Sequence, residues 1–292
     1  MTSVSLARLK ALLAVIFWGG SFIAVKVAVA QVSFYTLVWL RFAIGFLTLL
    51  ALLLARREFR LPGLRETVTF AGLGFLGVFF HNTLQAVGLK TAAAGMSGLI
   101  VASNPIVIAV LGSMVLKESL SPARMWGILL AAFGILVILS RGDPRFFFRE
   151  GISAGELLMI ASVFSWAAFS VLSRRALQRT PALLGMTCAI FFGLLCGTVP
   201  FVLMGGYREL AVINPGGWAG ILFLGIFCSA LSYLFWYDAL RVLPASEVGA
   251  FLYVNTVVSV IASVILLGEP ATGAMMVGGS LVFLGVWMVN RK

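Results

Sequence analysis

Apolar runs of about 20 residues alternate with short polar segments along this chain, and this pattern restricts the folds open to it. A helix of that length crosses the roughly 30 Å hydrocarbon layer of a lipid bilayer. Only 11% of the 292 residues are charged and 61% are hydrophobic, whereas a soluble protein needs far more polar surface. The chain is therefore predicted to be an all-α integral membrane protein.

Ten apolar windows have the length of a membrane-crossing helix. We predict transmembrane helices over residues 10–30, 35–55, 68–89, 93–116, 123–140, 154–176, 182–204, 217–240, 246–267 and 272–290. Prolines fall in the gaps between windows, where helices begin or end. Ser121 before Pro122 predicts the start of the fifth helix, and Thr272 is predicted to cap the tenth.

The two halves of the chain repeat each other. Trp18 lies 148 residues before Trp166, and Asn104 lies 151 residues before Asn255. The second offset also relates other pairs, namely Leu89 and Leu240, Gly98 and Gly249, Leu116 and Leu267, Glu118 and Glu269, Gly127 and Gly278, and Gly134 and Gly285. We therefore predict two five-helix repeats, residues 8–140 and 154–290, joined by a loop over residues 141–153.

An odd number of spans requires the second repeat to insert upside down relative to the first. Inverted repeats of this kind form transporters whose binding site lies near the bilayer midplane, between the repeats. The sequence thus predicts ten transmembrane helices, arranged as two inverted five-helix repeats around a central cavity. We expect a secondary-type transporter of small molecules that works by alternating access.

The distribution of lysine and arginine predicts the orientation. With a cytoplasmic N-terminus, fourteen of the 21 basic residues lie on the inner side and six on the outer side, with Arg41 inside the second span. Because basic residues concentrate on the cytoplasmic side, both termini are predicted to face the cytoplasm of a cell, in a bacterial inner membrane. The basic residues flank apolar runs and form no continuous patch, so we expect them to contact lipid and not nucleic acid.

With these features the chain resembles the EamA-type permeases of the drug/metabolite transporter superfamily over nearly its whole length. Besides the duplicated ten-span layout, the resemblance rests on Ile16-Phe17-Trp18-Gly19 and Phe164-Ser165-Trp166-Ala167 in the first helix of each repeat, and on Leu116-Lys117-Glu118 and Leu267-Gly268-Glu269. It implies a permease that moves metabolites, commonly outward. Within the superfamily, the aromatic-rich character is similar to that of the aromatic amino acid exporters.

Polar side chains inside the predicted spans are the first candidates for a binding site, because they are costly in lipid. His81 is the only histidine and lies in the third span near Asn82 and Gln85. We expect it to line the cavity, with a structural role as the alternative, and its reference pKa of about 6.5 suits proton coupling. Asn104 and its repeat mate Asn255 could bind substrate or hydrogen-bond between helices.

Aromatic side chains are the second group of candidates. Trp18 and Trp166 lie near the middle of their spans, away from the interfaces where tryptophan concentrates. They could form a gate or an aromatic wall, or they could simply pack. The predicted substrate-binding set is completed by Phe80, Ser232, Trp236 and Tyr253.

Charged residues are placed towards the ends of the predicted spans. Glu118 and Glu269 are predicted to cap the openings of the fifth and tenth helices, with proton coupling as the alternative, and Glu156 is interpreted in the same way at the sixth. Arg41 lies deeper in its span, where it could be functional or could extend its side chain to the interface.

The acidic residues indicate the charge of the substrate. All ten lie in loops or near helix ends, so we expect no carboxylate at the midplane, where a desolvated cation needs a counter-charge. The sequence therefore favours export of neutral or zwitterionic metabolites, above all amino acids with aromatic ones among them. Efflux of cationic or aromatic drugs through cation–π contacts is the alternative.

An enzyme interpretation rests on Gly95-Met96-Ser97-Gly98, which matches the GxSG of intramembrane serine proteases. The only possible base, His81, precedes this serine, whereas rhomboid-type proteases place it afterwards, so we expect no enzyme activity. The cysteines Cys188, Cys196 and Cys228 show no disulfide or metal spacing. No nucleotide-binding motif is present, and we expect a monomer without cofactor or metal.

Overall fold

The computed structural model describes residues 3–92, 100–140, 143, 145, 153–178, 180–267 and 272–291, and every regular element in this part of the chain is a helix. The first half contains α1 (Ser3–Val29), α2 (Phe34–Ala55), α3 (Leu64–Gly74), η1 (Phe75–Phe80), α4 (His81–Gly88), α6 (Asn104–Leu116) and α7 (Pro122–Leu139). The second half contains α8 (Ala154–Ala176), α9 (Ala182–Leu203), α10 (Gly206–Glu209), η3 (Leu210–Val212), α11 (Pro215–Phe223), η4 (Leu224–Leu231), α12 (Ser232–Val242), α13 (Ala245–Ala250), α14 (Leu252–Leu267) and α15 (Gly273–Asn290).

Seven segments of the described chain are long and apolar enough to cross a membrane. They are Ser3–Ser21, Phe34–Ala55, Leu64–Gly88, Ala154–Ala176, Ala182–Leu203, Pro215–Val242 and Gly273–Asn290, and two shorter apolar helices cover Ile100–Leu116 and Pro122–Ile138. Together with α14 these segments overlap the ten predicted windows, and in seven of the windows the described helix is long and apolar enough to span a membrane. The predicted helical residues 93–99, the Gly95–Gly98 motif and Glu269 lie outside the described residues.

Side-chain caps explain where several helices begin. Ser121 accepts a hydrogen bond from the Arg124 backbone N–H, and Thr272 accepts one from the Met275 N–H, which confirms both predicted caps. Ser153 and Glu156 form a reciprocal capping box at α8, as expected for a glutamate in a first helical turn. Each cap satisfies backbone donors that a helix start leaves unpaired.

The helix α1 begins at Ser3, seven residues before the predicted start of the first span. The basic residues Arg8 and Lys10 lie within this helix, and each pairs with an acidic residue of the second repeat. Arg8 contacts Glu247, and Lys10 contacts Asp238.

The third span of each repeat contains a π-helical stretch at the equivalent place, η1 in the first and η4 in the second. Such wide turns leave backbone carbonyl groups that need other donors, and they are common at functional sites. Here Ser165 Oγ donates to the Leu76 carbonyl over 2.8 Å, and Tyr233 Oη donates to the Gly77 carbonyl over 3.3 Å. Both donors come from the second repeat, so the π stretch connects the halves.

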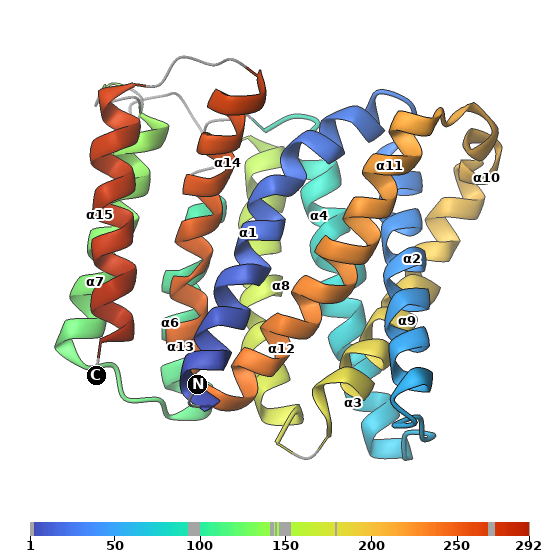
Figure 1. The fold of residues 1–292 in the computed structure, drawn as a ribbon, viewed down its shortest axis with the longest axis horizontal. Coiled ribbons are helices and arrows are strands. Elements are labelled where there is room, and N and C mark those ends of the chain that lie inside the picture. The colour runs from blue at the N-terminus through green and yellow to red at the C-terminus, as the bar shows by residue number, and fades with distance from the viewer. Residues whose placement is uncertain are drawn as a thin grey trace.

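The two repeats interleave and run in opposite directions. α1 packs against α12 and α14, and its counterpart α8 packs against α4 and α6. Arg8 at the start of α1 and Arg174 at the end of α8 both lie beside α13, through Glu247 and Glu118 respectively. Both chain ends lie at this edge of the bundle, which we call the N-terminal face (Figure 1). The opposite face carries Gln31, whose side chain accepts from the Asn214 N–H.

At one side of the bundle α7 and α15 lie against each other along their lengths (Figure 1). Four glycines lie at the contact, and they form two pairs of repeat mates, Gly127 with Gly278 and Gly134 with Gly285. Each contacts the mate of the other pair: a Cβ on Gly127 would lie 2.7 Å from the Gly285 carbonyl oxygen, and a Cβ on Gly134 would lie 2.6 Å from the Gly278 carbonyl oxygen. The helices can approach this closely only because no side chain intervenes.

Candidate functional site

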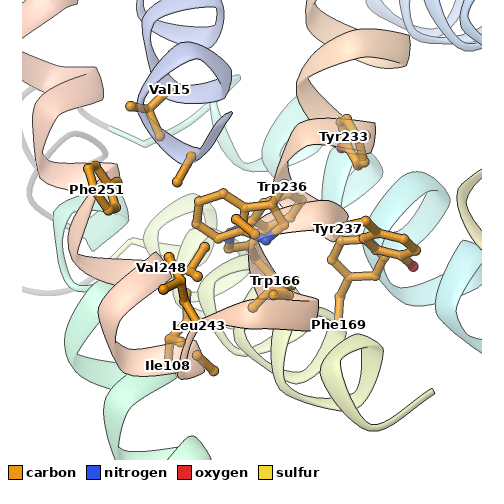
Figure 2. Close-up of a cluster of buried hydrophobic side chains, with 14 of the residues drawn as sticks. Val15, Ile108, Trp166, Phe169, Tyr233, Trp236, Tyr237, Leu243, Val248 and Phe251 are labelled. Carbon is orange, nitrogen blue, oxygen red and sulfur yellow. The ribbon is translucent and has the colours of Figure 1, made fainter. Parts of the chain in front are cut away.

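An aromatic cluster occupies the centre of the bundle, where the two repeats meet (Figure 2). Trp18 of α1 and Trp166 of α8 meet with ring centroids 5.4 Å apart and ring planes at 82°. Tyr233 and Trp236 of α12 each lie 5.5 Å from Trp18, and His81 lies 5.1 Å from Trp166. The edge-to-face contacts of Trp18 with Trp166 and Tyr233 hold these rings in defined orientations.

Hydrogen bonds fix two of these indoles. Trp18 Nε1 donates to the Cys228 carbonyl over 2.8 Å, at a position in η4. Trp236 Nε1 donates to Ser170 Oγ over 3.3 Å. With its polar atom bound, each ring presents apolar surface to its surroundings.

Next to this cluster lies a cavity of about 190 Å³, on the side towards the opposite face. Both repeats contribute to its wall. It is lined by Trp18, Ser21, Arg41, His81, Asn82, Gln85, Val101, Ala102, Asn104, Pro105, Trp166, Tyr233, Leu252, Asn255 and Thr256. Aromatic faces therefore form one part of the wall and uncharged hydrogen-bonding groups another, as in sites for small amphipathic molecules.

Several polar groups of the wall are held by the backbone. His81 Nδ1 donates to the Ser162 carbonyl over 3.0 Å, which places the imidazole proton on that nitrogen because a carbonyl can only accept. Asn82 Nδ2 donates to the Val78 carbonyl, and Asn104 Nδ2 donates to the Val101 carbonyl. The Asn104 side chain is buried, yet its Oδ1 has no hydrogen-bond partner among the described residues.

Five of the nine side chains predicted to bind substrate line this cavity, namely Trp18, His81, Asn104, Trp166 and Asn255. The other four lie elsewhere. Trp236 is fully buried behind Trp18, and Ser232 donates to the Phe227 carbonyl in η4 of its own span. Phe80 stacks on Phe75, and Tyr253 is buried outside the cavity, with a hydroxyl that has no partner among the described residues.

The cavity also contains residues that the sequence did not assign to it, among them Arg41, Tyr233 and Thr256. Arg41 carried the clearest signal, since a charged side chain deep in a span is a functional candidate by default. Tyr233 and Thr256 carried no such signal in the sequence, because nothing in an apolar helix of this composition indicates which face is turned inward.

On the other side of the aromatic cluster the bundle is closed towards the N-terminal face. The first layer is aliphatic and contains Ile108, Leu243 and Val248, none more than 3% exposed (Figure 2). Because these described side chains are buried and carry no polar groups, they offer a hydrophilic molecule no hydrogen bonds at this level.

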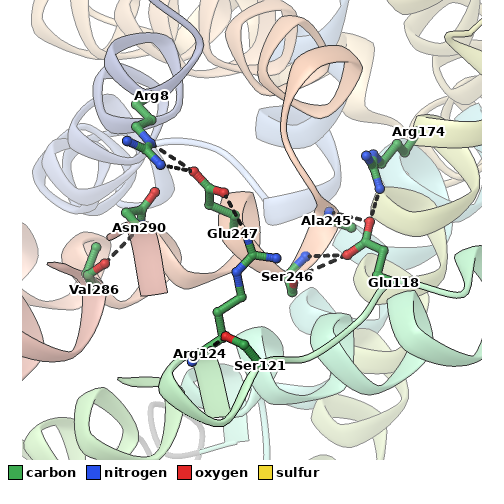
Figure 3. A network of polar contacts seen from close by, with 10 residues as sticks. All are labelled: Arg8, Glu118, Ser121, Arg124, Arg174, Ala245, Ser246, Glu247, Val286 and Asn290. Carbon is green, nitrogen blue, oxygen red and sulfur yellow. Dashed lines mark hydrogen bonds and ion pairs between the residues drawn. The ribbon is translucent and has the colours of Figure 1, made fainter. Parts of the chain in front are cut away.

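The second layer consists of ion pairs (Figure 3). Glu247 is 3% exposed and pairs with Arg8 at 2.8 Å and with Arg124 at 3.3 Å. Glu118 pairs with Arg174 and accepts from the Ala245 N–H over 2.8 Å. These contacts join α1, α7 and α8 to α13, so we call this set of side chains the ionic gate.

The location of Glu118 corrects the prediction that it caps the fifth helix. Its carboxylate accepts from Ala245 and Ser246, at the start of α13 in the other repeat. The reason is the left-handed backbone of Lys117, at φ 55°, which ends α6 and directs the following residue away from α7. The side chain thereby connects the repeats instead of stabilising its own helix pair.

Comparison with known proteins matches the EamA-like transporter family to residues 5–140 and again to residues 153–291. An uncharacterized transporter of Archaeoglobus fulgidus is 30% identical over 284 residues, which cover 96% of this chain and 97% of the relative. Another uncharacterized transporter of that organism is 27% identical over 280 residues, or 96% of each chain. A Salmonella typhimurium protein named "probable amino-acid metabolite efflux pump" is 25% identical over 295 residues, covering 95% and 92%.

A protein known from its crystal structure has the same fold, with a TM-score of 0.82 over 98% of both chains and 22% sequence identity. The matches to each half confirm the resemblance seen in the sequence, and they concern a family of transporters and not of enzymes. This chain is thus a multi-pass membrane protein that belongs to the EamA-like transporter family of the drug/metabolite transporter superfamily.

Proposed function

We propose that this protein exports amino acids or similar zwitterionic metabolites, aromatic ones among them. The observation that carries the proposal is the central cavity, where the faces of Trp18 and Trp166 stand beside hydrogen-bonding groups of His81, Asn104 and Asn255. An aromatic or aliphatic side chain of a substrate fits against the tryptophan faces, and the amino and carboxylate groups of an amino acid fit the hydrogen-bonding groups.

The charges around the cavity support this choice over a cationic drug. None of its described lining residues is acidic, and a desolvated cation needs a counter-charge. Cation–π contact with the tryptophans is the remaining way to hold a cation there. The Salmonella relative carries a name that refers to amino-acid metabolites, which is consistent with the same class of substrate.

We further propose ten membrane spans in a bacterial inner membrane, with both termini in the cytoplasm. The arginine and lysine bias supports this orientation. The N-terminal face would then be the cytoplasmic face, and the cavity would communicate with the outside. The functional unit in this proposal is a single chain.

In the proposed transport cycle, the ionic gate and the aliphatic layer open when the repeats rock about the aromatic cluster. In this orientation, the closure at the N-terminal face would make the structure a state closed on the cytoplasmic side. The opposite state would separate α13 from α1, α7 and α8, and it would admit substrate from the cytoplasm.

Proton coupling through His81 is the proposed energy source, with facilitated diffusion as the alternative. The hydrogen bond to Ser162 occupies Nδ1, so Nε2 is the nitrogen that can take up a proton. Protonation would place a positive charge in the wall of the cavity and change its affinity for a zwitterion.

A transport screen tests the function directly. The purified protein in liposomes is assayed for flux of amino acids, nucleosides, sugar phosphates and cationic dyes, beside protein-free liposomes. Flux of phenylalanine, tyrosine or tryptophan above the control is the expected result. Flux of cationic dyes alone would assign the protein to drug efflux instead.

A further inference from the structure

Arg41 lies about two turns into α2, and its side chain is turned into the protein. Its Nε donates to Ser229 Oγ over 2.9 Å, and Ser229 is fully buried in η4 of the other repeat. Its guanidinium carbon lies 5.0 Å from the centre of the Phe42 ring. The side chain lines the central cavity, so it does not extend along α2 to the membrane interface.

This arginine lacks a counter-charge within the described part of the chain. Each described ion pair involves other basic residues, and none of the described carboxylates contacts Arg41. A guanidinium has five N–H donors, and here only Nε has a partner among the described groups. A charge kept in a membrane protein interior without a partner is costly, which indicates that a ligand supplies the missing anion.

A second group in the same cavity also lacks a partner. Asn104 is 4% exposed, and its Nδ2 is bound to the Val101 carbonyl, which leaves Oδ1 as a buried acceptor without a donor among the described residues. Among the described residues, the cavity wall thus offers one unpaired cation and one unpaired acceptor. A ligand that satisfies both carries an anion and a hydrogen-bond donor.

We propose that Arg41 binds the carboxylate of the substrate and that Asn104 Oδ1 accepts a hydrogen bond from its α-amino or α-hydroxyl group. The planar guanidinium suits a carboxylate, because two parallel N–H donors can engage both oxygens. The apolar side chain of the ligand then lies against Trp18 and Trp166. This inference deepens the proposed function: the substrates are α-amino and α-hydroxy acids with apolar or aromatic side chains, and amines without a carboxylate are rejected.

Ligand binding to the purified full-length protein tests this assignment through quenching of tryptophan fluorescence. The probes are L-phenylalanine, phenyllactate, 3-phenylpropionate, which lacks the donor, and phenethylamine, which lacks the carboxylate. We expect phenylalanine and phenyllactate to bind best, 3-phenylpropionate more weakly and phenethylamine weakest. Phenethylamine binding as tight as that of phenylalanine, or no binding of any probe, overturns the proposal.

Variants then locate the carboxylate. Arg41→Gln should weaken phenylalanine binding by roughly tenfold or more, the loss expected for hydrogen bonds to a charged group, and should not weaken phenethylamine binding. Arg41→Lys should retain part of the affinity, because lysine keeps the positive charge but lacks the two parallel N–H donors of the guanidinium. Arg208→Gln, which changes an arginine at the opposite face outside the cavity, is the matched control and should bind like the wild-type protein.

The Ser229→Ala variant covers the case in which Arg41→Gln does not fold. It keeps the guanidinium and removes only the hydroxyl that holds it, so it should weaken phenylalanine binding less than Arg41→Gln. The assignment is overturned if Arg41→Gln folds and binds phenylalanine with wild-type affinity. If Arg41→Gln does not fold, it is overturned if Arg41→Lys and Ser229→Ala both bind phenylalanine with wild-type affinity. If binding depends on Arg41 but liposomes show no amino acid flux, the proposed function fails while the carboxylate site stands.

Discussion

Trp18 and Trp166 hold equivalent positions in the first helix of each repeat, and in the folded protein their rings are in edge-to-face contact, with centroids 5.4 Å apart. Repeat mates can touch only where they lie on the approximate symmetry axis that relates the two halves. The contact therefore marks the point about which the repeats are arranged. Because the cavity lies against it, a substrate bound there would touch both halves at once.

Replacement of Trp166 by alanine should weaken transport about two- to tenfold, because one aromatic contact contributes roughly 0.5–1.5 kcal/mol beyond its buried area. The half-saturation concentration in liposomes measures the effect. Trp126→Ala removes a tryptophan that is 66% exposed in α7 and serves as the control. Equal losses in both variants would remove Trp166 from the binding site.

Replacement of His81 tests proton coupling. His81→Ala is expected to reduce transport and to abolish its dependence on an imposed pH gradient, because the nitrogen that takes up the proton is gone. His81→Gln supplies a polar side chain that does not titrate, and it should also lose the pH dependence. Full transport with unchanged pH dependence in both variants excludes coupling through this residue and leaves the transporter assignment intact.

The ionic gate predicts the effect of Glu247→Gln. The change leaves Arg8 and Arg124 without their shared anion, which should destabilise the closed state by roughly 1–3 kcal/mol, less than for a fully buried pair because both arginines are partly exposed. The readout is the rate at which a maleimide modifies a cysteine introduced at Val15, which is fully buried behind the gate. The experiment uses a background without the native cysteines.

We expect the Val15 cysteine to react about five- to 150-fold faster in the Glu247→Gln protein, since each 1.4 kcal/mol changes an equilibrium tenfold. Arg60→Gln breaks the ion pair with Glu66, which lies outside the gate, and should leave the rate unchanged. An unchanged rate in Glu247→Gln contradicts the role of this carboxylate in closing the N-terminal face.

Close packing of α7 on α15 predicts a large cost for one methyl group. A Cβ on Gly134 would lie 2.6 Å from the Gly278 carbonyl oxygen, so Gly134→Ala should destabilise the protein by roughly 1–3 kcal/mol through overpacking. Gly72 in α3 has nothing within 4 Å of its Cβ position, and Gly72→Ala should be neutral or stabilising. Thermal unfolding in detergent compares the two, and equal melting temperatures would contradict the tight contact.

The proposed orientation predicts which introduced cysteines an impermeant maleimide reaches in intact cells. A cysteine at Tyr207, which is half exposed at the opposite face, should react from outside. One at Pro62, between α2 and α3, should react only after the membrane is permeabilised. External labelling at position 62 would reverse the topology.

Much of the architecture could be predicted from the sequence, because the signals are local. Long apolar runs require helices in a bilayer, and the caps at Ser121 and Thr272 depend only on neighbouring backbone groups. The duplicated residues predicted the EamA repeats, since uncommon residues at a constant offset rarely coincide by chance. The repeat mates Gly127 and Gly278 are among these duplicated residues. Their contacts with Gly285 and Gly134 could be seen only in the folded structure.

The site itself depended on tertiary structure. His81 and Ser232 occupy equivalent positions after the π-helical stretches, yet the imidazole reaches the Ser162 carbonyl and lines the cavity, while the shorter hydroxyl returns to Phe227 in its own span. Apolar helices of this kind show little periodicity, so the sequence does not indicate which face turns inward. For the same reason the inward orientation of Arg41 could not be distinguished from an extension to the membrane interface. Only the packing of α2 against η4, which brings Ser229 to its guanidinium, decided that Arg41 belongs to the cavity.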